Sequence, residues 1–144
     1  MKRIVYFVML TIILLCSCVA CKTLPNTYQF ENKDEKIVSV ELMHNPKAPK
    51  GYTGQTFELI RELEQHEIEP FMESIYALET HLTLTPPAGD FGPNIACVTY
   101  ENGSKEYFAS WHIESVEKGE KLTGVGGYYF RGDCFDELFL EYTK

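Results

Sequence analysis

Positive charge is scarce in this sequence and unevenly placed along it. The chain has 13 lysines and arginines against 21 aspartates and glutamates, for a formal net charge of −8. Lys2 and Arg3 precede the first acidic residue, Glu31, so the part of the chain beyond them is more acidic still. An acidic surface is repelled by phosphate backbones and by anionic lipid headgroups. We therefore expect no nucleic acid as a partner, and we do not expect the folded part to lie flat on a membrane.

The motifs that usually identify enzymes and metal proteins are also missing. The sequence has no nucleophile elbow, no phosphate-binding loop, no dinucleotide fingerprint and no internal repeat. The histidines are His44, His66, His81 and His112, and none is spaced from another as in the HExxH metal motif. Each is expected at the surface or at a sheet edge rather than as a ligand. The sequence therefore predicts neither a metal nor a cofactor.

Beyond the amino-terminal segment the chain has two cysteines, Cys97 and Cys134. In an oxidising exterior they could form a disulfide bond, or they could stay as two separate core thiols; free thiols are slightly preferred. A third interpretation makes Cys134 a catalytic nucleophile, because the start of a helix lowers the pKa of a thiol. His112 would then be its base. Nothing in the sequence links these two residues, so a thiol-dependent enzyme is the alternative hypothesis.

One long apolar run opens the chain. After Lys2 and Arg3, residues 4–15 are apolar except for Thr11. This length is typical of the hydrophobic core of a signal peptide, whereas a membrane-spanning helix needs about 20 apolar residues. If the run is extended to Cys21, an uncleaved signal anchor is the simpler alternative.

The end of the run resembles a bacterial lipobox. Leu15-Cys16-Ser17-Cys18 has a large aliphatic residue, two small residues and a cysteine whose thiol would receive a diacylglycerol chain. Cys21 closes a second frame that lacks leucine. We expect residues 1–17 to be a lipoprotein signal peptide, Cys18 (alternatively Cys21) to be lipidated, and residues 18–27 to be a tether. The chain should then be exported and held by lipid on the cell membrane or outer envelope, with its domain outside the cytoplasm.

Residues 28–144 are predicted to form one α+β domain. Strands are indicated by β-rich runs at residues 37–43, 81–85, 95–100, 105–113 and 122–130. Residues 56–63 suit either a strand or a helix, and a strand is preferred. One helix is expected to begin at Pro70, because proline fits the first helical position, and another spans 134–142 behind Asp133 as N-cap. The expected architecture is an antiparallel meander with two helices packed on one face.

Asn102-Gly103 is the clearest local signal, because both residues tolerate the positive φ of a type I′ hairpin turn. A two-residue loop would fix the register so that Val98 lies opposite Tyr107. The expected faces are then Val98, Tyr107, Ala109 and Trp111 under the helices, and Cys97, Phe108, Ser110 and His112 on the outer, partly wet side. This assignment places His112 away from any buried site.

Three groups of residues carry a resemblance to a known protein group. They are Phe30-x-Asn32-x4-Ile37, Tyr100-Glu101-Asn102-Gly103 and Phe135-x-x-Leu138-x3-Tyr142. These patterns resemble a group of small uncharacterised lipoproteins of gut and clostridial bacteria, which have a lipobox, one strand-rich domain and a closing helix. The resemblance covers most of residues 28–142 and implies a location and a fold, but no activity. The main hypothesis is therefore a non-enzymatic binding or interaction module, whose partner is an envelope or extracellular protein or ligand.

Overall fold

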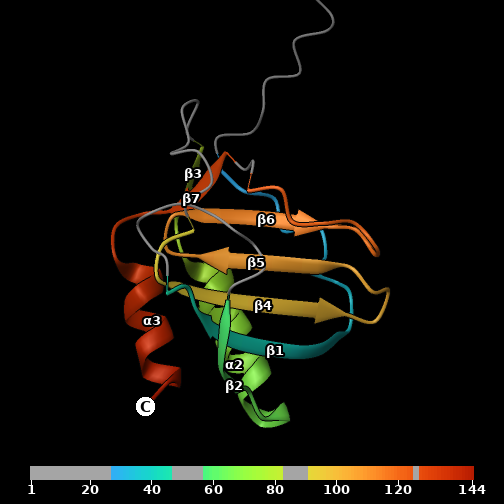
Figure 1. Ribbon diagram of the computed structural model, residues 1–144, viewed down its shortest axis with the longest axis horizontal. Helices are drawn as coiled ribbons and strands as arrows, with labels where there is room; N and C mark the ends of the chain where they lie inside the picture. Colours follow the sequence, from blue (N-terminus) through green and yellow to red (C-terminus); the bar gives the residue numbers. More distant parts are fainter. Residues whose placement is uncertain (1–26, 47–56, 83–90, 125–126) are drawn as a thin grey trace, which may run out of the picture.

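The structure is a computed structural model that describes residues 27–46, 57–82, 91–124 and 127–144. Within these residues, seven strands form one antiparallel sheet in the order β2-β1-β4-β5-β6-β7-β3, and two helices complete an α+β fold (Figure 1). The elements are β1 (Ile37–His44), β2 (Glu58–Glu62), α2 (Gln65–Ala77), β3 (Thr80–Leu82), β4 (Asn94–Tyr100), β5 (Lys105–Ala109), β6 (His112–Val116), β7 (Tyr128–Phe130) and α3 (Cys134–Tyr142). The α+β class and the antiparallel sheet are confirmed.

Short strands lie at both edges of the sheet. β2 pairs with β1 at one edge, so the preference for a strand within residues 56–63 is confirmed. β3 crosses to the other edge and pairs with β7, where Thr80 lies opposite Phe130. The hydroxyl of Thr80 accepts a hydrogen bond from the backbone N–H of Tyr28 at 2.9 Å. The first residues of the domain are thereby attached to the β3 edge.

Helix α2 begins at Gln65, so the prediction that Pro70 opens the helix is wrong. Glu64 is the N-cap, and its backbone N–H donates to the carboxylate of Glu67 at 2.8 Å in a capping box. This arrangement satisfies amide groups that otherwise have no partner at a helix start. Pro70 lies inside the helix. Because glutamate is an unusual first residue of a capping box, the sequence provides only a weak signal for this helix start.

Helix α3 has the predicted bounds, but its start differs in one detail. Asp133 occupies the N-cap position and its side chain makes no capping hydrogen bond. Gly132, at φ 63°, makes the turn before it. The strand expected at residues 122–130 is shorter than predicted and covers Tyr128–Phe130, and residues 83–85 of the expected strand 81–85 lie outside the described part of the chain.

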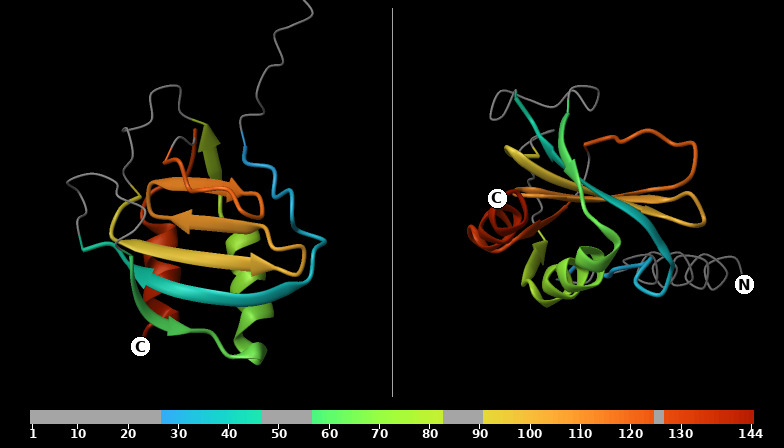
Figure 2. Two further views of the ribbon diagram at one scale, coloured as in Figure 1. Left: turned by 45° about the vertical axis from the view of Figure 1, so that its right-hand side comes forward. Right: turned by 90° about the horizontal axis from the view of Figure 1, so that it is seen from below.

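The main core joins both helices to the sheet (Figure 2). Its helical members are Ile68, Phe71, Met72, Ile75, Phe135, Leu138 and Phe139, and its strand members include Val40, Leu42, Ala96, Val98, Tyr100, Phe108 and Ile113. The rings of Phe71 and Tyr142 meet at 5.0 Å, so α2 also contacts α3. Each helix therefore buries an apolar stripe in this core. Val38, two residues before the buried Val40 on β1, is nevertheless 55% exposed, because the register of β1 shifts between Ile37 and Ser39 and interrupts the alternation.

The Asn102-Gly103 hairpin exists, but the predicted register is wrong by one residue. Tyr100 N–H donates to Ser104 O at 3.0 Å and Gly103 N–H donates to Tyr100 O at 2.9 Å, so the loop has three residues. Gly103 takes the left-handed position at φ 87°, as in a type I turn followed by a bulge. Val98 therefore lies opposite Glu106, and Cys97 opposite Tyr107.

This shift inverts the predicted faces of β5, because a slip of one residue turns its side chains to the other side of the sheet, whereas Val98 on β4 stays in the main core as expected. Phe108 is buried in the main core. Trp111 is 44% exposed and His112 is only 3% exposed, the reverse of the expectation for both. The expected strand 105–113 is also interrupted, because a turn at Ser110 and Trp111 separates β5 from β6.

A second, smaller core lies on the opposite face of the sheet. Its buried members are Phe91, Ile95 and Ala109, with Met43, Phe57, Tyr107 and Leu122 packed against them. Ile95 and Val98 belong to different clusters, as the alternation of side chains along a strand requires. Both faces of the sheet therefore bury apolar residues.

Candidate functional site

The predicted lipidation residues Cys18 and Cys21, the signal peptide and most of the tether lie outside the described residues. In the part of the chain that the structure does describe, no helix is long and apolar enough to cross a membrane.

Cys97 and Cys134 are both free thiols. Cys97 is buried on β4 and alternates with Val98, so its side chain points to the face of the smaller core. Cys134 packs against the main core. The two side chains therefore lie in different surroundings, and the structure joins neither of them in a disulfide bond.

The structure does not bring Cys134 and His112 together. The Cys134 thiol donates to the backbone carbonyl of Arg131 at 2.8 Å. Burial raises the pKa of this thiol, and the nearby acidic residues Glu137 and Asp133 raise it further. A catalytic thiolate needs a lowered pKa and a base within hydrogen-bond reach. His112 makes its contacts with Phe91 and Glu114 instead. Cys134 and His112 therefore do not form a nucleophile–base pair.

His112 is buried rather than partly wet, and its partner is Glu114. The ring of His112 packs edge-on against Phe91 with centroids 4.2 Å apart, and its Nε2 lies 3.0 Å from Glu114 Oε2. Glu114 also accepts hydrogen bonds from the backbone and hydroxyl of Thr123, both at 2.7 Å, and from Gly124 N at 2.9 Å. This cluster fastens the loop after β6 onto the sheet. Its sequence signal is the spacing His112-x-Glu114, which places both side chains on one face of a strand.

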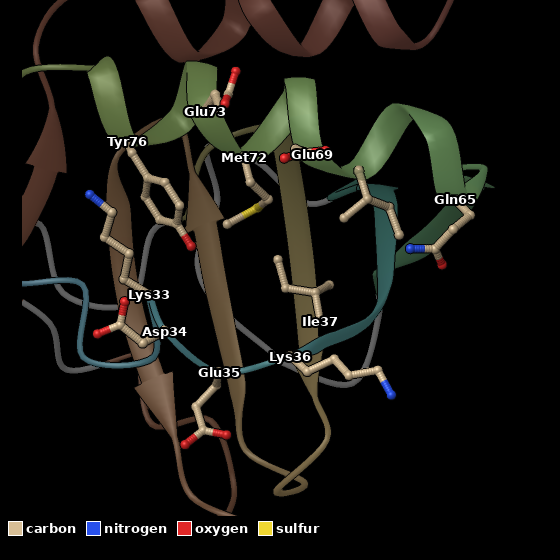
Figure 3. Close-up of a pocket in the computed structure, with 11 residues that line it drawn as sticks. Lys33, Asp34, Glu35, Lys36, Ile37, Gln65, Glu69, Met72, Glu73 and Tyr76 are labelled. Carbon is tan, nitrogen blue, oxygen red and sulfur yellow. The ribbon is translucent and has the colours of Figure 1, made fainter.

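A cavity of about 460 Å³ lies beside α2 and is the candidate binding site, here called the α2 pocket (Figure 3). It opens between α2 and residues 33–37, the segment that leads into β1. Its apolar lining consists of Ile37, Ile68, Met72 and Tyr76. Figure 3 shows Met72 and Tyr76 reaching from α2 toward the sheet. The helical spacing that buries Ile68 and Met72 also presents Tyr76 at the same side of α2.

Charged side chains surround the apolar lining. They are Lys33, Asp34, Glu35 and Lys36 on the segment before β1, and Glu69 and Glu73 on α2. Lys36 forms an ion pair with Glu101 at 2.9 Å. The ammonium of Lys33 lies 5.2 Å from the centre of the Tyr76 ring. Acidic residues therefore outnumber basic ones around the pocket, and one of the two cations already has an anionic partner.

Behind Tyr76, two further tyrosines donate hydrogen bonds to a fully buried carboxyl group. Glu106 has no exposed surface and accepts hydrogen bonds from Tyr28 at 2.8 Å and from Tyr100. Burial raises the pKa of Glu106 despite these donors. Burial, followed by the charge of Glu106, also raises the pKa of Tyr76. The wall of the α2 pocket is thus continuous with a buried polar cluster that the sequence patterns did not indicate.

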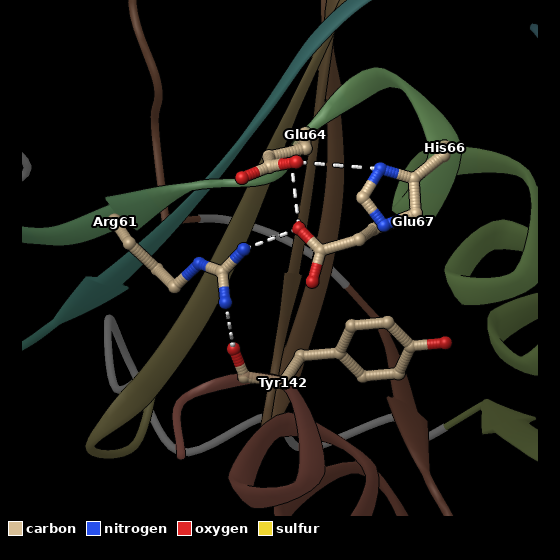
Figure 4. Close-up of polar contacts among 5 residues, drawn as sticks. All are labelled: Arg61, Glu64, His66, Glu67 and Tyr142. Carbon is tan, nitrogen blue, oxygen red and sulfur yellow. Dashed lines mark hydrogen bonds and ion pairs between the residues drawn. The ribbon is translucent and has the colours of Figure 1, made fainter.

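Arg61 fixes the end of α2 at which the pocket begins (Figure 4). Its guanidinium pairs with Glu67 in the first turn of α2 and donates to the backbone carbonyl of Tyr142 at 3.2 Å. β2, α2 and the end of α3 are therefore connected through one side chain. Arginine suits this position because its planar group donates in several directions at once.

Among the residues that the structure describes, no group of three or more histidine, cysteine, aspartate or glutamate side chains could hold a metal ion. Comparison of the chain with protein-family models, with curated proteins and with solved structures found no match in any of the three. The functional inference therefore depends on the geometry of the pocket and on its charges.

Proposed function

We propose that the domain is a non-enzymatic binding module whose site is the α2 pocket. The observation that carries this proposal is the cavity itself, with a volume of about 460 Å³, an apolar lining and a charged rim. Sites for small organic ligands have volumes of roughly 300–1,000 Å³ and combine apolar walls with a few polar groups that orient the ligand. The α2 pocket has this composition.

Binding is better supported than the alternative of a thiol-dependent enzyme. The lining of the α2 pocket includes neither cysteine nor histidine. Cys134, the candidate nucleophile, donates to a backbone carbonyl and has a raised pKa. A nucleophilic thiol would need the opposite environment.

We further infer that the chain is an envelope lipoprotein, as its resemblance to the small lipoproteins of gut and clostridial bacteria implies. Lipid on Cys18, or alternatively on Cys21, would hold the chain at the membrane through residues 18–27. The ten residues from Cys18 to Tyr28 can span at most about 35 Å. The pocket would therefore encounter ligands or partners close to the membrane surface.

We also infer that both helices cover the same face of the sheet. Residues from α2 and α3 share one core cluster with strands β1, β4, β5 and β6, and the other face carries a separate cluster. The α2 pocket then lies at the side of the helical layer, between α2 and the segment before β1.

The proposal is tested by titrating the full chain, reconstituted in nanodiscs of zwitterionic lipid, with small aromatic compounds and recording amide NMR shifts. We expect shifts that cluster at residues 33–37 and 65–76. Glu69→Trp, which places a bulky ring at the pocket, should abolish them. Glu141→Trp makes the same change at an exposed position of α3 and should leave them intact. Shifts scattered over the domain, or equal in both variants, would contradict the proposal.

A further inference from the structure

We infer that the ligand of the α2 pocket is an organic cation, an ammonium group carried on a short apolar body. This inference rests on the proposed function and specifies the chemical class that the site selects. It follows from three features of the pocket: an excess of carboxylates, an aromatic ring that already holds a cation, and an apolar lining of limited size.

The first feature is the charge around the pocket. Asp34, Glu35, Glu69 and Glu73 line it, against Lys33 and Lys36. The charge of Lys36 is balanced by Glu101, which is not among the lining residues. Within the described ranges, Glu69 and Glu73 form no ion pair. An anionic ligand would therefore be repelled, and a cationic one attracted.

The second feature is the ring of Tyr76. Lys33 extends its ammonium over this ring at 5.2 Å from the centre, within the range of a cation–π contact. Asp34 is near enough for its charge to act on the Tyr76 hydroxyl. Lys33 thus marks a position over the Tyr76 ring at which an ammonium group is stabilised. The ammonium group of a ligand would compete with Lys33 for this position.

The third feature is the apolar surface beside that ring. Ile37, Ile68 and Met72 line the cavity next to Tyr76. A ligand with its ammonium over the ring can bury a short hydrocarbon or aromatic body against these side chains. The volume of about 460 Å³ accommodates a body of this size.

An ammonium group can belong to a free amphipathic amine or to a lysine side chain of a polypeptide. Phenethylammonium represents the first source and N-acetyl-lysine methylamide the second. Binding of either compound at the lining residues supports the ammonium site, and the comparison of their affinities identifies the source.

The test uses calorimetric and NMR titration of the full chain in zwitterionic nanodiscs with three probes of one skeleton: phenethylammonium, phenethyl alcohol and hydrocinnamate. We expect the ammonium compound to bind roughly tenfold more tightly than the alcohol, and the anion to bind most weakly. Added salt should reduce the affinity for the ammonium compound, because it screens exposed charges.

Matched variants separate the local effect from the net charge of the domain. The double variant E69Q/E73Q should weaken binding of phenethylammonium roughly three- to tenfold. E137Q/E141Q removes two glutamates with the same spacing from α3 and should leave it unchanged. Lys33→Gln removes the competing cation and should tighten binding, whereas Lys121→Gln, outside the pocket, should not.

The outcomes distinguish the two proposals. If the three probes bind at the pocket with equal affinity, or if Lys33→Gln weakens the binding of phenethylammonium, the cation inference is overturned and the binding module stands. If no probe shifts the amides of the lining residues, the proposed function itself is overturned.

Discussion

Two buried glutamates on neighbouring strands have pKa values shifted in opposite directions. Glu106, on β5, is enclosed by the main core and receives hydrogen bonds from two tyrosine hydroxyls, and burial raises its pKa. Burial acts in the same direction on Glu114, on β6. There, hydrogen bonds from His112, Thr123 and Gly124 outweigh it and hold the pKa of this carboxyl below its usual value. The two residues should therefore give opposite dependences of stability on pH.

We expect Glu106→Gln to be more stable than the wild type at neutral pH, because it removes a buried charge. This difference in the free energy of unfolding should shrink as the pH falls. The unfolded pKa is about 4.3, and the folded pKa is raised, so the folded protein holds this proton more tightly than the unfolded chain does. The ionised carboxylate therefore costs stability above the folded pKa, and that cost disappears as pH falls toward 4.3. Urea unfolding across a pH series should show the wild type gaining on the variant as pH falls. A difference that does not vary with pH would contradict a raised pKa.

For Glu114 the sign is reversed. Its folded pKa is depressed, so its stabilising contribution is complete above about 4.3 and is lost as pH falls through the folded pKa. Glu114→Gln should cost about 1–3 kcal/mol at neutral pH, because an amide cannot accept all the hydrogen bonds of the carboxylate. The same urea series should show this cost shrinking in acid. If Glu114→Gln and Glu106→Gln follow the same trend, one of the two assignments is wrong.

At the scale of elements, α3 offers a direct comparison of a buried and an exposed leucine. Leu138 is 9% exposed in the main core, whereas Leu140, two positions on, is 53% exposed. Leu138→Ala should reduce the free energy of unfolding by about 2–5 kcal/mol. Leu140→Ala removes the same atoms from the same helix and should change it by less than about 0.5 kcal/mol. Equal effects of the two substitutions on urea unfolding would contradict the burial of Leu138 in the main core.

The sequence predicted elements better than their ends and registers. The bounds of α3 follow from a regular apolar spacing, and this periodicity survives in the structure. The start of α2 was misplaced because Pro70 gave a strong local signal, while the capping box at Glu64 decided the boundary. Asn102-Gly103 marked the hairpin correctly, but the dipeptide fits both a two-residue and a three-residue loop. Only long-range pairing settles that choice, and it determines which face of the sheet Tyr107, Phe108 and Ala109 occupy.

At the scale of the whole molecule, the α2 pocket could not be predicted from local patterns. Its lining comes from residues 33–37 and from one side of α2, which are separated in the chain by β1 and β2. Ile68 and Met72 follow the ordinary spacing of a helix stripe and carry no separate signal for a cavity. The sequence draws attention to cysteines and histidines instead, because these residue types are common in catalytic and metal-binding sites. Charged residues around an apolar lining become a site only when the fold brings them together.

The attachment of the whole molecule to its membrane is tested at Cys18. Leu15-Cys16-Ser17 follows a basic start and an apolar run, so Cys18→Ser should abolish labelling by radioactive palmitate and change the fractionation of the chain with membranes. Cys97→Ser alters a cysteine inside the domain and should retain the label. If Cys18→Ser keeps the label and Cys21→Ser loses it, the second frame is the lipidation site. If both variants keep the label and the membrane fractionation of the wild type, the lipobox interpretation fails. The pocket would then no longer be held near the membrane by lipid at either cysteine.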